Sequence, residues 1–211
     1  MKQILAGNKP FLIPWAAAVL FFLILMGCYD HSRTGIHLML NGCHTPFLDA
    51  FFRVATGIGG NLPWLVCAAF LIARMWKGAM LTLAQLVATL FVQPLKHIMH
   101  HPRPLTVFTE AHISLPMVDG VHLHAWNSFP SGHTAAAFAL MFGIAVLLPK
   151  WWHKVLCLVI AVTAGYSRIY LSQHFLDDVL AGSVLGVLSV LIAMIFFKQD
   201  TQNGNKTQET K

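Results

Sequence analysis

The sequence predicts an all-α membrane protein, a six-transmembrane-helix bundle with a short amphipathic interfacial helix before the second span. Two observations predict this class. Of the 211 residues, 56% are hydrophobic and only 10% are charged, and apolar runs recur from residue 11 to residue 197 without a long polar linker. Because a soluble domain carries about 25% charged residues, this chain lacks the polar surface of a water-soluble globule. We therefore expect one membrane domain over residues 1–198 and a disordered cytoplasmic tail over the polar residues 199–211.

Six apolar stretches approach the roughly 20 residues that are needed to cross about 30 Å of hydrocarbon. They are Phe11–Tyr29, Leu62–Trp76, Ala79–Leu95, Gly132–Leu148, Val155–Leu171 and Val179–Phe197. The second is short, and we expect Arg74 to extend it by reaching the membrane interface. Before it, Thr45 can cap a helix, with Pro46 in the first turn and Asp49 near the positive helix end. This amphipathic helix, running to about Val54, is expected to lie on the membrane.

The charges between the spans predict the orientation in the membrane, because cytoplasmic loops collect Lys and Arg. Six spans place both termini on one side, where nine cationic residues face two acidic ones, whereas the opposite side has five against six. We therefore expect both termini in the cytoplasm. The protein itself is expected in the cytoplasmic (inner) membrane of a bacterium. The pI of 9.4 then reflects topology, and we expect no nucleic-acid partner. Eleven of the twelve histidines fall on the outer side.

Two features of the N-terminal third leave alternatives open. The residues Leu25 to Cys28 resemble a bacterial lipoprotein cleavage box, but the 19-residue apolar stretch before Asp30 favours a spanning helix. Cys28 and Cys43 both fall on the outer side and could pair in an oxidising compartment. Spacing alone does not show that their sulfurs meet.

Three stretches that are far apart in the sequence fall at the predicted outer face. They are KHIMHHPRP at residues 96–104, PSGH at 130–133 and SRIYLSQHFLDD at 167–178. They carry three fixed cations, Lys96, Arg103 and Arg168, which could surround a phosphate group. Ser131 and Gly132 open a helix whose free backbone N–H groups attract anions, and the glycine lets an anion approach closely. The combination predicts an oxyanion-binding site.

The same stretches carry candidate reactive groups. His174 and Asp178 are four residues apart, so on one helix face the carboxylate can bond one imidazole nitrogen and raise the basicity of the other. This is the preparation that a histidine nucleophile needs. His133 lies on a different span and could protonate a leaving alkoxide. Asp177 would point elsewhere, and we assign it no catalytic role.

Taken together, the three stretches resemble the signature K-x6-RP, PSGH and SR-x5-H-x3-D of the type 2 phosphatidic acid phosphatase superfamily, which also includes bacterial acid phosphatases and vanadium haloperoxidases. Every defining position is present: Lys96, Arg103, Pro104, Pro130, Ser131, Gly132, His133, Ser167, Arg168, His174 and Asp178. The three stretches cover about an eighth of the chain. The predicted six-span layout is similar to that of the membrane branch of the family.

The resemblance implies that His174 attacks phosphorus to form a phosphohistidine, oriented by Asp178, and that His133 protonates the leaving group. It further implies that the phosphoryl oxygens are held by Lys96, Arg103, Ser131, Gly132 and Arg168, without a metal or other cofactor. The charge count agrees, since three cations beside one carboxylate make a poor Mg²⁺ site. The expected activity is hydrolysis of a lipid phosphate monoester or of the terminal phosphate of a lipid diphosphate.

Several alternatives remain at this point. The same site could pass the phosphoryl group to a second lipid, and a vanadate-dependent oxidase is a further, less favoured enzyme. A non-catalytic protein could instead bind metal through its outer histidines, because His97 and His101 have helical i, i+4 spacing; solvent, interface or head-group contacts are favoured for them and for His100. Expected partners are membrane lipids and a substrate such as phosphatidylglycerol phosphate, phosphatidic acid, lipid A or undecaprenyl diphosphate. Gly182 and Gly186 are expected to form a helix-packing face inside the bundle.

Overall fold

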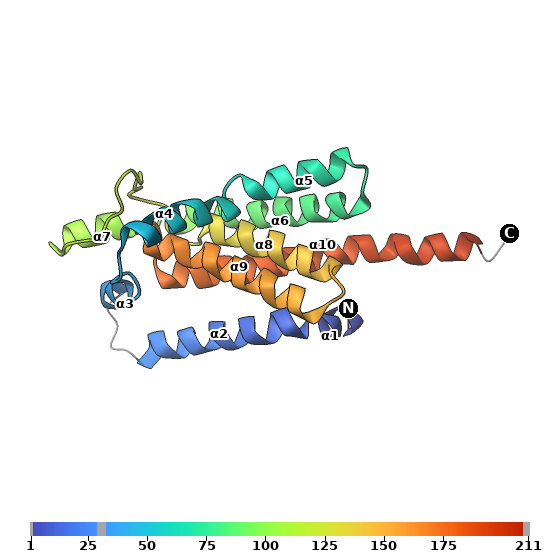
Figure 1. Ribbon diagram of the computed structural model, residues 1–211, viewed down its shortest axis with the longest axis horizontal. Coiled ribbons are helices and arrows are strands. Elements are labelled where there is room, and N and C mark those ends of the chain that lie inside the picture. The colour runs from blue at the N-terminus through green and yellow to red at the C-terminus, as the bar shows by residue number, and fades with distance from the viewer. Residues whose placement is uncertain (1, 29–32, 209–211) are drawn as a thin grey trace.

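The protein is all-helical in the computed structural model, which describes residues 2–28 and 33–208, and this confirms the predicted class (Figure 1). The elements are α1 (Lys2–Gly7), α2 (Lys9–Cys28), α3 (Arg33–Leu40), α4 (Pro46–Ala55), the 3-10 turn η1 (Thr56–Gly59), α5 (Leu62–Ile72), α6 (Trp76–Met99), α7 (Pro104–Glu110), α8 (Gly132–Leu147), α9 (Trp151–Tyr170) and α10 (Leu176–Gln208). Each of the six predicted apolar stretches falls largely on one of the helices α2, α5, α6, α8, α9 and α10.

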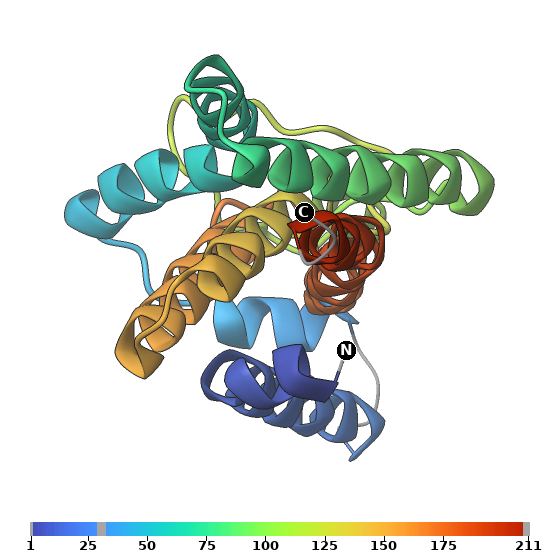
Figure 2. The same ribbon diagram turned by 90° about the vertical axis from the view of Figure 1, so that its right-hand side faces the viewer.

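These six helices form an elongated bundle in which the chain reverses direction from each to the next (Figure 1). The short helices α3, α4 and α7 gather at one end of the bundle. The other end holds α1, and the C-terminal part of α10 projects beyond it. Viewed along the bundle, α8, α9 and α10 lie between α2 on one side and α5 with α6 on the other (Figure 2).

Three described helices are long and apolar enough to cross a membrane, in α2, α6 and α10. A fourth span results if Pro46–Gly59 and Leu62–Ile72, which bend by 47° at their junction, are counted as one broken span. Helix α8 is apolar but has only 16 residues. The chain is therefore an integral membrane protein with three to four spans by this criterion, fewer than the six that the sequence predicts.

The region before the second span differs from its prediction in one respect. Helix α4 begins as expected, with the Thr45 side chain accepting a hydrogen bond from the backbone N–H of Leu48 at 3.2 Å. However, α4 continues through η1 towards α5, so the interfacial helix and the span form one bent unit. Helix α5 also ends at Ile72, earlier than predicted, because a turn follows in which Arg74 has a positive φ of 52°.

The core is centred on α8, which packs closely against α10. A Cβ atom on Gly182 would lie 2.5 Å from the carbonyl oxygen of Ser131, and one on Gly186 would lie 2.5 Å from that of Ala135. No side chain fits at these distances, so both glycines are needed for the two backbones to approach. The predicted small-residue packing face is confirmed, and its partner is α8.

Two predictions reach residues that the structure describes only in part. Helix α10 continues to Gln208, whereas residues 209–211 lie outside the described residues, so the disordered tail over 199–211 stays a prediction. Cys43 is an exposed free thiol, and the side chain of Cys28 lies outside the description. The described residues therefore do not test whether Cys28 and Cys43 pair.

Candidate active site

His174 and Asp178 form a buried pair where α9 is joined to α10. The Nδ1 atom of His174 lies 3.4 Å from Oδ2 of Asp178, and the two side chains are only 1% and 0% exposed. The histidine is positioned by its own backbone, because the N–H groups of Gln173 and His174 both donate to the carbonyl oxygen of Arg168, at 2.9 and 3.1 Å. This turn closes the end of α9, so the spacing between Arg168 and His174 fixes both residues at one site.

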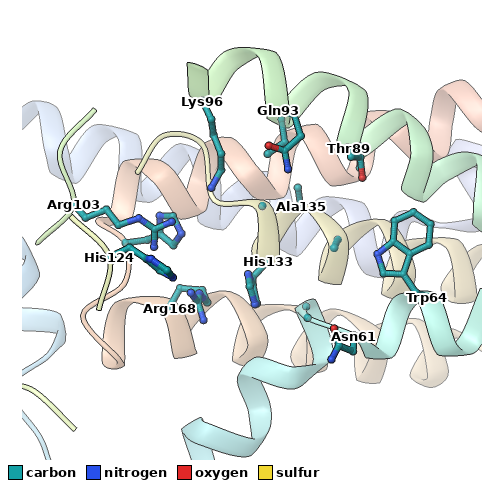
Figure 3. A pocket seen from close by; sticks show the side chains of 17 residues that line it. Asn61, Trp64, Thr89, Gln93, Lys96, Arg103, His124, His133, Ala135 and Arg168 are labelled. Carbon is teal, nitrogen blue, oxygen red and sulfur yellow. The ribbon is translucent and has the colours of Figure 1, made fainter. Parts of the chain in front are cut away.

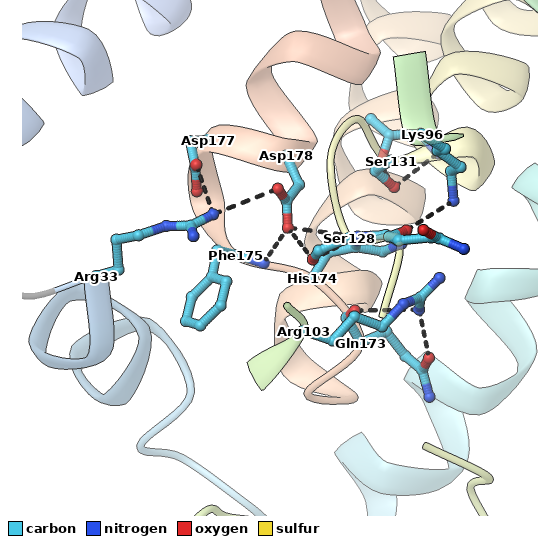
Figure 4. Close-up of polar contacts among 12 residues, drawn as sticks. Arg33, Lys96, Arg103, Ser128, Ser131, Gln173, His174, Phe175, Asp177 and Asp178 are labelled. Carbon is cyan, nitrogen blue, oxygen red and sulfur yellow. Dashed lines mark hydrogen bonds and ion pairs between the residues drawn. The ribbon is translucent and has the colours of Figure 1, made fainter. Parts of the chain in front are cut away.

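The Asp178 carboxylate has further partners (Figure 4). Its Oδ2 atom accepts hydrogen bonds from the Ser128 hydroxyl and from the backbone N–H of Phe175, the latter at 2.9 Å. The Ser128 oxygen also lies 3.4 Å from Nδ1 of His174. Since Nδ1 faces these oxygens, the other ring nitrogen of His174 is left for the cavity that this residue lines.

Arg33, on α3, approaches this carboxylate from the opposite side. Its Nη2 atom donates to Oδ2 of Asp177 at 2.6 Å and lies 3.5 Å from Oδ1 of Asp178. The guanidinium also lies 4.3 Å from the centre of the Phe175 ring, in cation–π contact. From the sequence, Arg33 was assigned no role beyond its charge. In the structure Asp177 faces this arginine while Asp178 also faces the histidine.

The three predicted cations come from three different helix ends and meet around one cavity. Lys96, at the end of α6, donates to the carbonyl of Asn127 at 3.3 Å, and Arg168 donates to the Thr56 hydroxyl at 2.6 Å. Arg103 is held by carbonyl groups, with Nε 2.9 Å from the Trp126 oxygen. Among the described residues, no carboxylate lies within ion-pair distance of any of the three. Such a cluster of uncompensated cations is a site for an anion.

The PSGH segment forms the start of α8 as predicted. The Ser131 hydroxyl caps the helix, accepting from the backbone N–H of Thr134 at 3.4 Å and from its hydroxyl at 2.8 Å. A backbone bond of 2.9 Å, from the N–H of Ser131 to the carbonyl of Asp178, ties this helix start to α10. His133 lies against η1, where Gly59 packs so tightly that a Cβ atom would come within 2.1 Å of the His133 carbonyl oxygen.

A cavity of about 400 Å³ connects these residues (Figure 3). Its lining includes six of the eight predicted site residues, namely Lys96, Arg103, Gly132, His133, Arg168 and His174, but not Ser131 or Asp178, which support it from behind. It also includes Asn61, Trp64, Thr89, Gln93 and His124, none of which the sequence assigned to the site. Beyond the cations, the cavity extends along α5 and α6 into the bundle.

The electrostatic environment favours a neutral imidazole at His174. Burial, together with the nearby Arg103, Arg168 and Lys96 cations, holds the pKa of His174 well below its ordinary value of 6.5. The same causes, burial first and then Arg103, lower the pKa of His124. A neutral imidazole with one nitrogen held by a carboxylate and the other facing a cationic cavity is arranged to attack an electrophilic phosphorus atom.

The outer histidines have partners other than a metal. The His100 ring stacks on Trp126 at 5.1 Å, and its Nδ1 atom lies 3.0 Å from the side-chain oxygen of Asn127. The His101 ring packs near Phe129. Over residues 2–28 and 33–208, no group of three or more His, Cys, Asp or Glu side chains is placed to hold a metal ion. The structure therefore gives the histidine-rich metal site no support.

Sequence comparison decides the family. The profile of the PAP2 superfamily matches residues 77–202, a range that contains all eight predicted site residues. The chain belongs to the PAP2 superfamily. The resemblance of the three motifs to this family is thereby confirmed.

Individual proteins of known name are similar to this chain over most of its length. A lipid A 4′-phosphatase of Bacteroides thetaiotaomicron is 27% identical over 164 residues, covering 72% of this chain and 71% of the relative. An undecaprenyl-diphosphatase of Sulfolobus acidocaldarius is 28% identical over 183 residues, covering 82% and 85%. The crystal structure of a transmembrane PAP2-type phosphatidylglycerolphosphate phosphatase from Bacillus subtilis has a TM-score of 0.63 at 26% identity, over 88% of this chain and 96% of that one.

Several contacts of this site were not predicted from the sequence. Ser128 and Arg33 both contact Asp178, yet they lie 50 and 145 residues from it in the chain. Ser128 stands only three residues before the capping Ser131, so its place beside a family motif was the one available signal. Arg33 and Thr56 carry no pattern of spacing that relates them to the motifs.

Proposed function

We propose that this chain is an integral membrane lipid phosphatase, which removes a phosphate monoester or the terminal phosphate of a diphosphate from a lipid. Membership of the PAP2 superfamily and relatives that carry lipid phosphatase names support the class. The apolar helices support a substrate whose chains stay in the bilayer while its phosphate enters the cavity. Lipid A, undecaprenyl diphosphate, phosphatidylglycerol phosphate and phosphatidic acid all meet this description.

In the proposed membrane arrangement, α2, α5, α6, α8, α9 and α10 each cross the bilayer, giving six spans. The alternating direction of these helices supports it, as does the position of α1 and the C-terminal part of α10 at the end of the bundle opposite α3, α4 and α7 (Figure 1). The excess of cationic residues on the side of the termini supports a cytoplasmic location for that side. The cavity then opens towards the outer leaflet of a bacterial inner membrane.

In the first chemical step, neutral His174 attacks phosphorus through Nε2. A nitrogen–phosphorus bond forms as the bond between phosphorus and the lipid oxygen breaks, and protonated His133 gives its proton to that oxygen. Asp178 holds Nδ1 and stabilises the positive charge that develops on the ring. Lys96, Arg103, Arg168 and the N-terminus of α8 at Ser131 and Gly132 bind the phosphoryl oxygens.

In the second step, water hydrolyses the phosphohistidine. His133, now neutral, takes a proton from the attacking water while the nitrogen–phosphorus bond breaks. Inorganic phosphate leaves, and both histidines return to their starting state. The three cations supply the charge stabilisation that a metal supplies in other phosphatases, so this mechanism uses no metal or other cofactor.

The observation that carries the proposal is the combination at one cavity of a buried His174–Asp178 pair and three cations without carboxylate partners among the described residues. The runner-up reaction uses the same phosphohistidine but transfers the group to a second lipid. Labelled lipid products separate the two, because hydrolysis gives free phosphate whereas transfer gives a new phospholipid.

The direct test is to trap the intermediate on purified protein in detergent with ³²P-labelled dioctanoyl phosphatidic acid. We expect an acid-labile, alkali-stable label on the wild type and none on His174→Ala, with phosphate release lost in parallel. EDTA should leave the rate unchanged, whereas vanadate should inhibit by occupying the phosphate position. Full phosphate release by His174→Ala, or loss of activity in EDTA, would contradict the proposed mechanism.

A further inference from the structure

One face of α6 carries polar side chains along the helix away from the cations, with Gln85 buried and Thr89 and Gln93 exposed. Gln85, Thr89, Gln93 and Lys96 are separated by four, four and three residues, which places them on the same side of a helix. The helix is otherwise apolar enough to cross a membrane. Polar side chains inside a membrane span are expensive unless they have a partner or a function.

Two of these side chains are used within the fold. Gln85 donates to the carbonyl of Ala136 on α8 at 3.1 Å, and the Thr89 hydroxyl donates to the carbonyl of Gln85 at 2.9 Å. Gln93 makes no side-chain hydrogen bond to another described residue, and it lines the cavity. Its amide is therefore available to a bound molecule.

A second free amide lies across the cavity on α5. Asn61 occupies the N-cap position of this helix, yet its side chain makes no capping hydrogen bond. It lines the same cavity as Gln93, and Trp64, one turn further along α5, lines the wall beyond it (Figure 3). Two unused amides and an indole thus face the space between α5 and α6.

The Asn61 and Gln93 amides lie where the leaving group of the substrate is expected in the proposed reaction. In an in-line displacement the departing oxygen lies opposite the attacking nitrogen of His174, and His133 is the residue that would protonate it. Figure 3 shows His133 between the cations on one side and Asn61, Thr89 and Trp64 on the other. The atoms of the lipid that follow the departing oxygen would therefore lie among the amides.

The two ends of the cavity differ in charge. All three fixed cations of its lining, Lys96, Arg103 and Arg168, lie at the phosphate end, whereas the lining groups beyond His133 are neutral. A diphosphate would place its second phosphate group among these neutral groups, where the lining offers no fixed cation to pair with it. A sugar or glycerol would instead find hydrogen-bond donors and acceptors there.

We propose that the Asn61 and Gln93 amides form a leaving-group subsite for a neutral, hydrogen-bonding part of a lipid, a sugar or a glycerol. The Thr89 hydroxyl, which donates to Gln85 and can still accept a hydrogen bond, belongs to the same subsite. The protein accordingly prefers phosphate monoesters of such lipids to isoprenyl diphosphates. This inference rests on the proposed lipid phosphatase function and narrows its substrate class.

The first experiment compares kcat/KM of the purified wild type on dioctanoyl phosphatidic acid, on lipid A and on farnesyl diphosphate. We expect at least one of the first two to exceed farnesyl diphosphate by about tenfold or more, because a site built for hydrogen bonds rejects a substrate that leaves them unmade. Comparing the first two substrates then distinguishes glycerol from sugar as the group that is bound. Faster hydrolysis of farnesyl diphosphate than of both monoesters would overturn the proposal.

The second experiment changes the subsite itself. Gln93→Leu should lower kcat/KM for the preferred monoester about tenfold while changing that for farnesyl diphosphate less than about threefold. Gln93→Arg should raise hydrolysis of farnesyl diphosphate, since it supplies a cation for the second phosphate. If the ratio between the two substrates stays at the wild-type value in both variants, the subsite is wrongly assigned.

Ile98→Arg is the matched control. Ile98 lies on the same helix, is 76% exposed and does not line the cavity, so the added cation should leave the substrate ratio unchanged. Failure of the proposed function would look different, because then the wild type would release no phosphate from any of the three substrates, or His174→Ala would match it. If Gln93→Arg fails to fold, the wild-type ratio and Gln93→Leu still decide the question.

Discussion

Two histidine–carboxylate pairs lie near the same end of the bundle, and only one of them faces the cavity. Nδ1 of His44 lies 3.1 Å from Asp49, with side chains that are 23% and 27% exposed, whereas the His174–Asp178 pair has 3.4 Å and 1% and 0%. The other nitrogen of His44 is taken by the side-chain oxygen of Asn41 at 2.8 Å. The other nitrogen of His174 has the cavity before it.

Under the proposed mechanism, a histidine–carboxylate pair is not by itself enough to make a nucleophile. Asp49 accepts from the Tyr170 hydroxyl as well as facing His44, so it links α4 to α9. Asp178 instead sits behind a histidine surrounded by cations. Reactivity is therefore expected to depend on what the second imidazole nitrogen faces. The same substitution can be made in each of the two pairs to test this.

The largest effect should come from removing each histidine in turn. His174→Gln should lower phosphate release by about a thousandfold or more, since the attacking atom is lost. His44→Gln should keep the rate within about threefold, because the hydrogen bonds that it removes, to Asp49 and Asn41, lie away from the cavity. The measurement is turnover of purified protein on dioctanoyl phosphatidic acid. Equal losses in the two variants would place His44 in the chemistry and break the comparison.

Removing the charge of each carboxylate should give the next largest effect. Asp178→Asn should lower kcat by about a hundredfold or more, because an amide neither fixes the imidazole tautomer nor stabilises its positive charge. Asp49→Asn should change kcat less than about fivefold and instead lower the melting temperature slightly, through the weakened link to Tyr170. Steady-state kinetics together with thermal unfolding in detergent check both expectations.

A smaller effect is expected from Arg33, which holds the far side of Asp178. Arg33→Gln should lower kcat about tenfold with KM changed little, as Asp178 loses a charged partner. Arg33→Lys should restore part of the rate. The matched control is Arg53→Gln, since Arg53 is exposed and bonds only the carbonyl of Asp119 among described residues. A change confined to KM would indicate that Arg33 acts on substrate binding instead.

The last prediction concerns protonation and sharpens the comparison without a mutation. Burial and neighbouring cations both disfavour the charged ring of His174, so its pKa is lowered and the ring stays neutral when the pH falls below 6.5. Nitrogen-15 NMR of histidine-labelled protein, assigned by comparison with His174→Gln, measures this directly. An imidazolium signal for His174 at pH 6.5 or above would contradict the expectation.

The family motifs could be recognised in the sequence because their residues are local to helix ends. The spacing from Arg168 to His174 is set by the turn that closes α9. Ser131 caps α8 through a local hydrogen bond that does not depend on the rest of the fold. Each motif thus carries its own geometry. That the motifs share one end of the bundle followed from counting apolar stretches, which also gave the all-α class.

The rest depends on contacts that leave no pattern in the sequence. Arg33 reaches Asp178 only because α3 folds back across the end of the bundle, and Gln93 faces a cavity only because α5 and α6 lie side by side there. The bend between α4 and α5 was missed for a similar reason. It depends on how η1 packs against His133, with Gly59 in the contact.

Two glycines of α10 control the geometry of the site from outside the cavity. Gly182 and Gly186 set how near α10 stands to α8, and so the separation of His133 from Asp178, although neither glycine lines the cavity. One methyl group added at Gly182 would meet the Ser131 carbonyl and push the two halves of the site apart. Larger residues at this helix contact can therefore lower the activity without changing any residue that lines the cavity.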